Sequence, residues 1–442
     1  MHTLFPLITG LSVAGFAVAF QEQTGKTKSC FWSPLVAEDQ LICAAPLSKQ
    51  RPRTVLNVKT PELWDHRSGE RYEPPREYTV PPPWQGPEHC HIEFCIFSNP
   101  DAGEGMSLVT TSRSAFVVAT SEMPLSTGLE AGAFYETEIA GKGSGLIANR
   151  TIRKGEIIME RPPALLIQSV PHADLSPEVR SDVYQAAVDR LPEPARARFL
   201  RQVGSNIYDK IDRNSFRIFV DGDRKHSAHL GVFPEVSKFN HDCRPNVHYR
   251  LSGLKHTTVA VRDIPAGEEL TISYIYTGIA RSKRLSQLDQ WGFACSCQQC
   301  TLNTTESGAS DNRIRQIKDL EAEIEELMSQ KRRGVGLRPE MGGKLVQLYR
   351  EERLDAYLAP AYTRAALIYA MFADEDRARE YAAEAVAALE RETGPRAKDG
   401  ESMRRLAEAP RGHWAWGVKV RKGRGGGGKN KTEGGKAEGK GK

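Results

Sequence analysis

Residues Asn240–Asn246 read Asn-His-Asp-Cys-Arg-Pro-Asn, and the rest of the chain can be interpreted outward from this stretch. Pro245 constrains a turn, and Asn240 and His241 place two polar side chains just before it. A strand-like run, Glu269–Tyr274, follows, and a close group of three cysteines comes after it, at Cys295, Cys297 and Cys300. Each of the three motifs is weak alone; their order and spacing make them informative together.

The late cysteines predict a metal site. Three thiols at Cys295, Cys297 and Cys300 cannot complete a tetrahedral zinc site, which takes four ligands, and Cys243 is the obvious fourth. The alternative is a pair of disulfides, which loops as small as Cys-x-Cys-x-x-Cys would strain. We therefore predict Zn²⁺ bound by Cys243, Cys295, Cys297 and Cys300, which would pin the later segment to the turn. An oxidising compartment would favour the disulfides instead.

Length and charge limit the broad class of the protein. A chain of 442 residues is too long for one core, so two to three domains are expected. The formal charge is +5, but the stretch from Arg411 onward carries ten Lys/Arg and two Glu, so the remainder sums to −3. A near-neutral body gives no reason to expect nucleic-acid binding, except weakly through the basic tail, for which a solvated chain is the simpler interpretation.

The first twenty residues resemble a secretory leader. Leu4–Phe20 carries no charge, and Ala17-Val18-Ala19 forms an A-x-A cleavage pattern before polar residues. We therefore predict a signal peptide at residues 1–20, with a secretory or extracellular location if it is removed. The alternatives are a buried first helix or an uncleaved anchor, with a cytoplasmic or nuclear location. No later stretch is as long and apolar as a membrane span, so no membrane is expected for the mature form.

Residues 21–133 form an N-terminal segment that contains many prolines and four cysteines. Its part at 21–100, with tryptophans at 32, 64 and 84, is predicted to have few regular elements. Ile92, Phe94 and Ile96 alternate, which predicts a strand rather than a zinc site at His89-Cys90-His91. A second short strand is predicted at 105–111. Four cysteines allow three disulfide pairings, of which Cys30–Cys43 with Cys90–Cys95 is one.

Residues 134–277 contain many short strand signals interrupted by helical spacing at 171–215, which predicts an α+β fold that is rich in β structure. Beyond the cysteines, a helical domain is predicted at 312–410. It includes an apolar stripe from Ile314 to Met328 and a hairpin at 354–371 and 376–392 with the small-residue spacing of a tetratricopeptide-like unit. Residues 419–442 are Gly/Lys-rich, which predicts a disordered tail.

Two further features could carry chemistry. Gly143 and Gly145 allow positive φ and close approach of a ligand, although most Gly-x-Gly pairs are only turns. Tyr274 is predicted to end the strand Leu270–Tyr274, and Tyr276 follows with the same strand parity. An isolated tyrosine in such a place usually packs, with its hydroxyl hydrogen-bonded.

Taken together, these motifs resemble the SET domain of protein lysine methyltransferases, at residues 134–277, with its post-SET zinc clip at 291–302. Asn214-Ser215-Phe216, Trp291-Gly292-Phe293 and the helical C-terminal domain are similar to the SET-and-MYND branch. The MYND finger itself is absent, because 171–215 contains no cysteine. The leader and the stretch around residues 94–111 resemble fungal SET proteins that begin with a secretory-type segment.

The resemblance implies a function and assigns roles to residues. It implies transfer of a methyl group from S-adenosylmethionine to a lysine of a protein substrate, histone or non-histone. Tyr274 would be catalytic, Tyr249, Ile272 and Tyr276 would line the lysine channel, and Ile272 stands where relatives often have an aromatic residue, so the number of methyl groups is open. The cofactor would contact Lys142, Gly143, Ser144, Gly145, Asn214, Asn240, His241 and Phe293.

Some features depart from the family pattern. Asp242 replaces a commoner serine, and Asn149-Arg-Thr151 and Asn303-Thr-Thr305 are glycosylation sequons close to the cofactor loop and the zinc clip. A secretory route would also separate the protein from a cofactor made in the cytosol. These departures keep a second hypothesis open, a non-catalytic SET protein of the secretory pathway that acts as a binding module.

Overall fold

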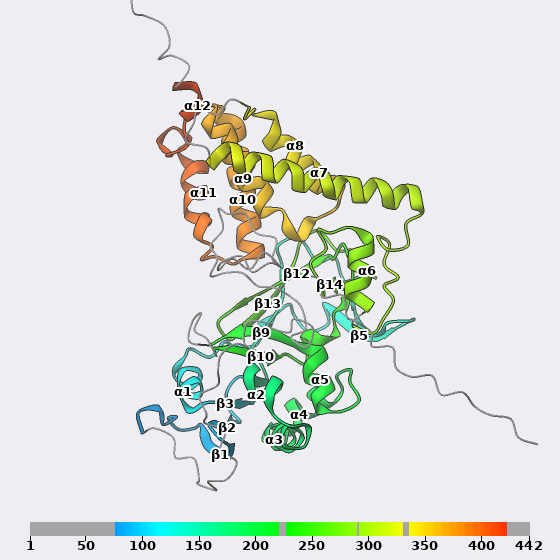
Figure 1. Cartoon of the computed structure of the whole chain (residues 1–442), viewed down its shortest axis with the longest axis vertical. Helices are drawn as coiled ribbons and strands as arrows, with labels where there is room; N and C mark the ends of the chain where they lie inside the picture. Colours follow the sequence, from blue (N-terminus) through cyan, green and yellow to red (C-terminus); the bar gives the residue numbers. More distant parts are fainter. Residues whose placement is uncertain (1–75, 221–226, 290, 330–335, 422–442) are drawn as a thin grey trace, which may run out of the picture.

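The computed structural model describes residues 76–220, 227–289, 291–329 and 336–421. The predicted leader, Cys30 and Cys43 lie outside these residues, as does the predicted tail except for its first three residues, which belong to a short helix. Three sheets and the helices packed on them form a β-rich body, and a bundle of helices forms the other end of the molecule (Figure 1). The α+β class predicted from the sequence is therefore confirmed.

The largest sheet has six strands, and the N-terminal segment supplies half of it. Strand β3 pairs in parallel with β8 through Ser107–Leu165 and Leu108–Leu166, so residues far apart in sequence form one core. The expectation of few regular elements in this segment is wrong for the described part of it. In spatial order the strands are β1 (Gln85–His91), β2 (Phe94–Asn99), β3 (Met106–Thr110), β8 (Leu165–Gln168), β10 (Ala228–Val232) and β9 (Ser215–Phe219).

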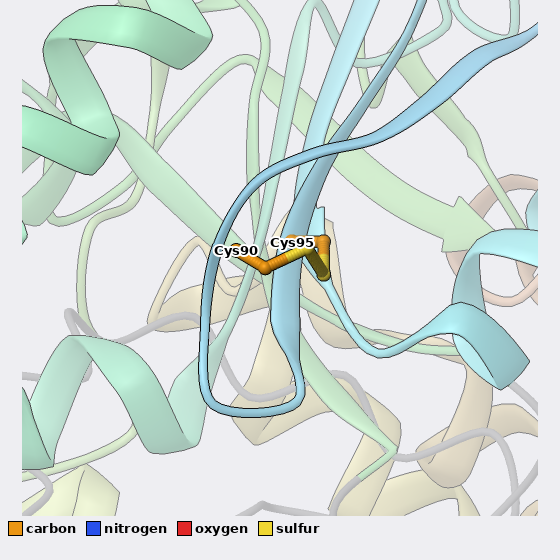
Figure 2. The surroundings of a disulfide bond; sticks show 2 residues. All are labelled: Cys90 and Cys95. Carbon is orange, nitrogen blue, oxygen red and sulfur yellow. A yellow bond between two sulfur atoms is a disulfide. The ribbon is translucent and has the colours of Figure 1, made fainter. Parts of the chain in front are cut away.

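A disulfide joins Cys90 to Cys95 across the β1–β2 hairpin (Figure 2), which settles one of the predicted pairings. The strand predicted from the alternation of Ile92, Phe94 and Ile96 begins only at Phe94. Ile92 lies in the hairpin turn with φ of 57° and is 37 % exposed, whereas β2 is buried on both faces. The alternation was therefore produced by a turn residue next to a fully buried strand.

Two smaller sheets of four strands each carry the motifs that define the chain. In one, β11 pairs in parallel with β14 through Asn240–Thr271 and His241–Ile272, which brings the Asn-His turn against the later strand. This sheet contains β11 (Asn240–His241), β14 (Glu269–Ile272), β6 (Gly143–Ala148) and β5 (Phe134–Ile139). The other contains β12 (Val247–Ser252), β13 (Lys255–Ala260), β7 (Ile157–Arg161) and β4 (Thr127–Gly128).

The predicted helical insertion is present and covers one face of the six-stranded sheet. Tyr184 and Phe199 are fully buried there against Leu165 and Leu230, because the helices place their apolar stripes on the sheet. The insertion consists of α2 (Ser169–Asp174), α3 (Pro177–Asp189), α4 (Glu193–Leu200) and α5 (Ile207–Asn214). Elsewhere in the body lie α1 (Ser112–Thr120), α6 (Arg281–Asp289) and the 3₁₀ turns η2 (Arg76–Tyr78) and η3 (Val236–Lys238).

The C-terminal helices form a second core around α9 (Ala359–Met371), all of whose residues are buried. The predicted start of this helix at residue 354 is too early, because Pro360 occupies its first turn and residues 355–357 form the 3₁₀ turn η4 (Asp355–Tyr357). The other elements are α7 (Thr304–Ser329), α8 (Glu340–Glu351), α10 (Glu375–Glu392), α11 (Lys398–Glu408), η5 (Pro410–Gly412) and α12 (Val418–Arg421). Within the described residues, no helix is long and apolar enough to cross a membrane.

Candidate functional site

A cavity of about 340 Å³ opens where the three sheets, the α4–α5 connection and the segment after Trp291 meet. Its wall unites most of the residues that the sequence analysis assigned to cofactor and substrate, although they come from widely separated parts of the chain. The predicted residues that line it are Lys142, Ser144, Asn214, Asn240, His241, Tyr249, Ile272, Tyr274 and Phe293.

Gly143 and Gly145 shape this wall without lining it. Gly143 has φ of 75°, a conformation that favours glycine. A Cβ on Gly145 would lie 2.7 Å from Asn240 Nδ2, so only glycine lets β6 approach the Asn-His turn. Asn240 Nδ2 donates to the Ser144 carbonyl at 3.2 Å and to Glu269 Oε1 at 2.9 Å. Glu269 also pairs with Lys142 at 2.5 Å, so loop, turn and strand are fixed together.

Tyr274 is held at both ends. Its backbone N–H donates to His241 Nδ1 at 3.0 Å, and its hydroxyl donates to the Phe239 carbonyl at 2.7 Å. The strand β14 ends at Ile272, so Tyr274 lies in the following turn and not at the strand end as predicted. Burial raises the pKa of Tyr274, so the hydroxyl stays protonated. Because the Tyr274 hydroxyl donates its proton to the Phe239 carbonyl, its oxygen can accept a hydrogen bond from a group in the cavity.

His241 links Tyr274 to the cysteines. Because Nδ1 accepts from the Tyr274 amide, the neutral ring carries its proton on Nε2, which lies 3.3 Å from Cys243 Sγ. Burial lowers the pKa of His241 to about 4, so the ring is neutral. Both ring nitrogens thus have partners within the protein, and the expected contact of the His241 side chain with the cofactor cannot use them.

The four predicted metal ligands come together. The sulfur atoms of Cys243, Cys295, Cys297 and Cys300 all lie within 4.8 Å of one another, and all four thiols are free. A tetrahedral zinc site with Zn–S distances of about 2.3 Å needs sulfurs about 3.8 Å apart. Cys243 Sγ and Cys300 Sγ are separated by 3.5 Å. The donor set and spacing therefore fit Zn²⁺, and the strained disulfides are not formed.

One predicted channel residue lies outside the cavity wall, and one predicted cofactor residue uses part of its side chain within the protein. Tyr276 does not line the cavity; its ring packs edge-on against Tyr357 of the helical domain at 5.6 Å. Tyr276 does not share the strand parity predicted for it with Tyr274, because the chain leaves the strand at Ile272. Asn214 lies in the wall, but its Nδ2 donates to the Val203 and Lys210 carbonyls, which leaves its oxygen for a ligand.

Several wall residues were not predicted. The Trp291 ring lies 5.0 Å from the Tyr274 ring, and its carbonyl accepts from Arg213 Nη1 at 3.1 Å. Trp291 belongs to the Trp291-Gly292-Phe293 motif, and in the sequence only its place beside Phe293 could have suggested that it lines the cavity. The wall also contains five Lys/Arg and, among the described residues, no Asp or Glu: Lys142, which was predicted, and Arg201, Arg213, Arg217 and Lys238, which were not. No local sequence signal gathers these cations, because they are spread from residue 142 to residue 238.

Comparison with known families agrees with this geometry. Residues 143–275, which supply the glycine loop, the Asn-His turn and Tyr274, match the SET domain. The chain therefore contains a SET domain over these residues. Its relatives include histone-lysine N-methyltransferase SMYD3 of Homo sapiens, 37% identical over 94 residues that cover 21% of this chain and 22% of the relative.

Two other relatives are similar over the same fraction of the protein. N-lysine methyltransferase SMYD2 of Homo sapiens is 34% identical over 118 residues, 26% of this chain and 25% of the relative. Histone-lysine N-methyltransferase SET5 of Meyerozyma guilliermondii is 33% identical over 108 residues, 23% and 22% of the two chains. The matched segments span about a quarter of these curated relatives.

Proposed function

We propose that this SET-domain protein is an S-adenosylmethionine-dependent protein-lysine N-methyltransferase. The observation that carries the proposal is the anchoring of Tyr274 in the cavity through both its backbone amide and its hydroxyl. The hydroxyl donates to the Phe239 carbonyl, so its oxygen lone pairs are available to a ligand. The matching SET domain and the methyltransferase names of the relatives support it.

The wall favours a neutral lysine amine. An amine must lose its proton before its lone pair can act as a nucleophile. Desolvation in the cavity lowers the pKa of an entering ammonium group, and the wall cations that have no paired acid among the described residues act in the same direction. The Tyr274 oxygen can then accept a hydrogen bond from the amine and orient the lone pair. Tyr249 and Ile272 would hold the apolar stem of the lysine.

The cofactor would fit the part of the cavity nearest the glycine loop. Lys142 and Asn240 would face it, and Phe293, which is 36 % exposed, offers a ring at the rim. When bound, S-adenosylmethionine would supply the methyl group. Zn²⁺ on the four cysteines would hold the segment that carries Trp291 and Phe293 over the cavity.

Two measurements test the proposal. Calorimetry on the purified full chain should detect binding of S-adenosylmethionine, and transfer of a labelled methyl group to lysine should be found with a panel of histones and total cell protein. Binding without transfer to any protein of the panel would contradict the enzyme. Absence of binding as well would support the alternative, in which the SET fold is a binding module.

A further inference from the structure

One wall of the cavity holds buried polar groups that none of the described residues satisfies. Gln202 is 3 % exposed, and neither its amide nitrogen nor its amide oxygen has a hydrogen-bond partner in the described part of the chain. Ser215 Oγ and Arg217 Nε are likewise buried without partners there. All three residues line the cavity. Leaving buried polar groups unpaired costs free energy, so a wall with several of them indicates a ligand.

These residues share one side of the cavity. Asn214 Nδ2 donates to the carbonyl of Val203, which places the Gln202–Val203 segment beside the start of β9. Ser215 and Arg217 follow on β9, and because they are two residues apart their side chains project from the same face of the strand. On β10, Val232 pairs with Ser215 and Leu230 pairs with Arg217. Val232 and Leu230 pack under the helical insertion, so Ser215 and Arg217 project from that same face of the sheet.

Arg217 differs from three of the other four cations of the wall, which are ion-paired. Lys142 pairs with Glu269, Lys238 with Glu136, and Arg213 with Asp209. Arg217 forms no ion pair among the described residues, its Nε has no hydrogen-bond partner there, and burial lowers its pKa without any compensating acid. A half-buried guanidinium without a counter-ion is costly, and its planar set of donors matches a carboxylate.

The position of the strand indicates where that carboxylate would come from. β9 is the edge strand of the six-stranded sheet, with β10 as its only neighbour within that sheet. An extended peptide can align with such an edge, and residues beside an inserted lysine would then pass close to Arg217. We propose that Gln202, Ser215 and Arg217 form a subsite that selects an Asp or Glu side chain near the methylated lysine of the substrate. This inference rests on the proposed function.

The test uses degenerate peptide libraries that contain one central lysine, each with a single flanking position set to Glu, Ala or Lys, and the full-length protein with labelled S-adenosylmethionine. We expect the wild type to methylate the Glu library about tenfold better than the Ala library at one flanking position, because charge-assisted hydrogen bonds contribute about 1.5 kcal/mol or more. Arg217→Met should remove this preference and Arg217→Glu should invert it toward Lys. Gln202→Met should weaken it.

A control and a binding arm separate the alternatives. Arg153→Met, in an exposed pair with Asp263 away from the cavity, should keep the wild-type preference. Calorimetry should give the same S-adenosylmethionine affinity for wild type and Arg217→Met within about twofold, whereas a tenfold loss with unchanged peptide preference would assign the carboxylate to the cofactor and overturn the proposal. Absence of an acidic preference in the wild type, or its persistence in Arg217→Met, would also overturn it. If the wild type bound cofactor but methylated no library, the proposed function itself would fail, and this inference with it.

Discussion

At the scale of single residues, Tyr249 is the group whose role the structure defines most narrowly after Tyr274. Its hydroxyl is buried in the channel wall without a partner among the described residues, and its ring stacks on His256 at a centroid distance of 5.2 Å. An unpaired hydroxyl at this place can hydrogen-bond to the substrate amine and restrict its rotation. Because the Ile272 side chain has no hydrogen-bonding atom, we expect Tyr249 to limit the number of methyl groups added.

Tyr249→Phe should therefore raise the fraction of di- and trimethyl product while methyl transfer continues, as measured by mass spectrometry of a methylated peptide over time. Tyr276→Phe is the matched control, because Tyr276 lies outside the cavity wall. An unchanged product distribution in Tyr249→Phe would rule out this role for the hydroxyl.

Gly145 shows how a single missing side chain supports the site. A Cβ there would meet Asn240 Nδ2 and Ile139 Cγ1, each at 2.7 Å. Gly145→Ala should push β6 away from the Asn-His turn and weaken S-adenosylmethionine binding about tenfold, at a cost in stability of about 1–3 kcal/mol. Calorimetry and thermal unfolding measure both effects. Gly308→Ala, in open space on α7, should bind cofactor normally and be slightly more stable.

At the scale of elements, the cluster of four cysteines and the Asn-His turn form one unit. Cys243 lies in the turn, the other three cysteines follow Phe293, and His241 contacts both Cys243 and Tyr274. Cys243→Ser should lower the zinc content from about one ion per chain, measured by elemental analysis, and weaken cofactor binding through Trp291 and Phe293. A variant that keeps its zinc and its cofactor affinity would show that Cys243 is not the fourth ligand.

The same turn is tied to the helical domain by a buried charge cluster. Arg244 pairs with Glu352, both side chains being almost completely buried, and Arg313 binds the other carboxylate oxygen at 2.8 Å. Gln299, next to Cys300, donates to Glu352 at 3.2 Å. Removing one partner of a buried pair leaves the other charge uncompensated. Glu352 therefore connects the Asn-His turn, the cysteine cluster and the helical domain.

Glu352→Gln should thus reduce the free energy of unfolding by about 3–5 kcal/mol, measured in denaturant. The exposed pair Arg405–Glu401 provides the comparison, and Glu401→Gln should cost less than about 1 kcal/mol. Equal effects of the two substitutions would mean that the buried cluster does not connect the domains.

At the scale of the whole molecule, stability should depend on pH through Glu392, at the junction of the two parts. Its carboxyl accepts from the Ala359 amide at 2.9 Å, and its carbonyl contacts His248 Nε2 at 3.2 Å. Burial raises the pKa of Glu392 from 4.5 to about 8. Because the folded state favours the protonated acid, the stabilisation is complete below the unfolded pKa and is lost as pH rises from 4.5 through about 8.

The wild type should therefore lose stability relative to Glu392→Gln between these pH values, in parallel thermal unfolding series. The buried imidazoles His248 and His256 act in the opposite direction at lower pH, since burial lowers their pKa to about 4 and about 3. They are common to both proteins and cancel in the difference. A difference that stays constant across this range would show that Glu392 does not titrate between the folded and unfolded states.

The sequence was sufficient for the parts of the site that local spacing encodes. Close approach at Gly145 and the grouping of the four cysteines follow from the small size of glycine and the ligand number of zinc, whereas the roles of Asn240 and Tyr274 were implied only by the resemblance to the SET domain. It was not sufficient where long-range packing decides. The parallel pairing of β3 with β8, the union of five cations in one wall and the contact of Arg244 with Glu352 join residues that no periodicity relates.

The most direct test of the central claim is methyl transfer by the wild type and by Tyr274→Phe, with S-adenosylmethionine binding measured on both. We expect Tyr274→Phe to keep cofactor affinity within about twofold but to lose methyl transfer by about a hundredfold or more, because only the hydroxyl that orients the amine is removed. Undiminished transfer by Tyr274→Phe, with cofactor bound, would contradict the mechanism proposed for this site.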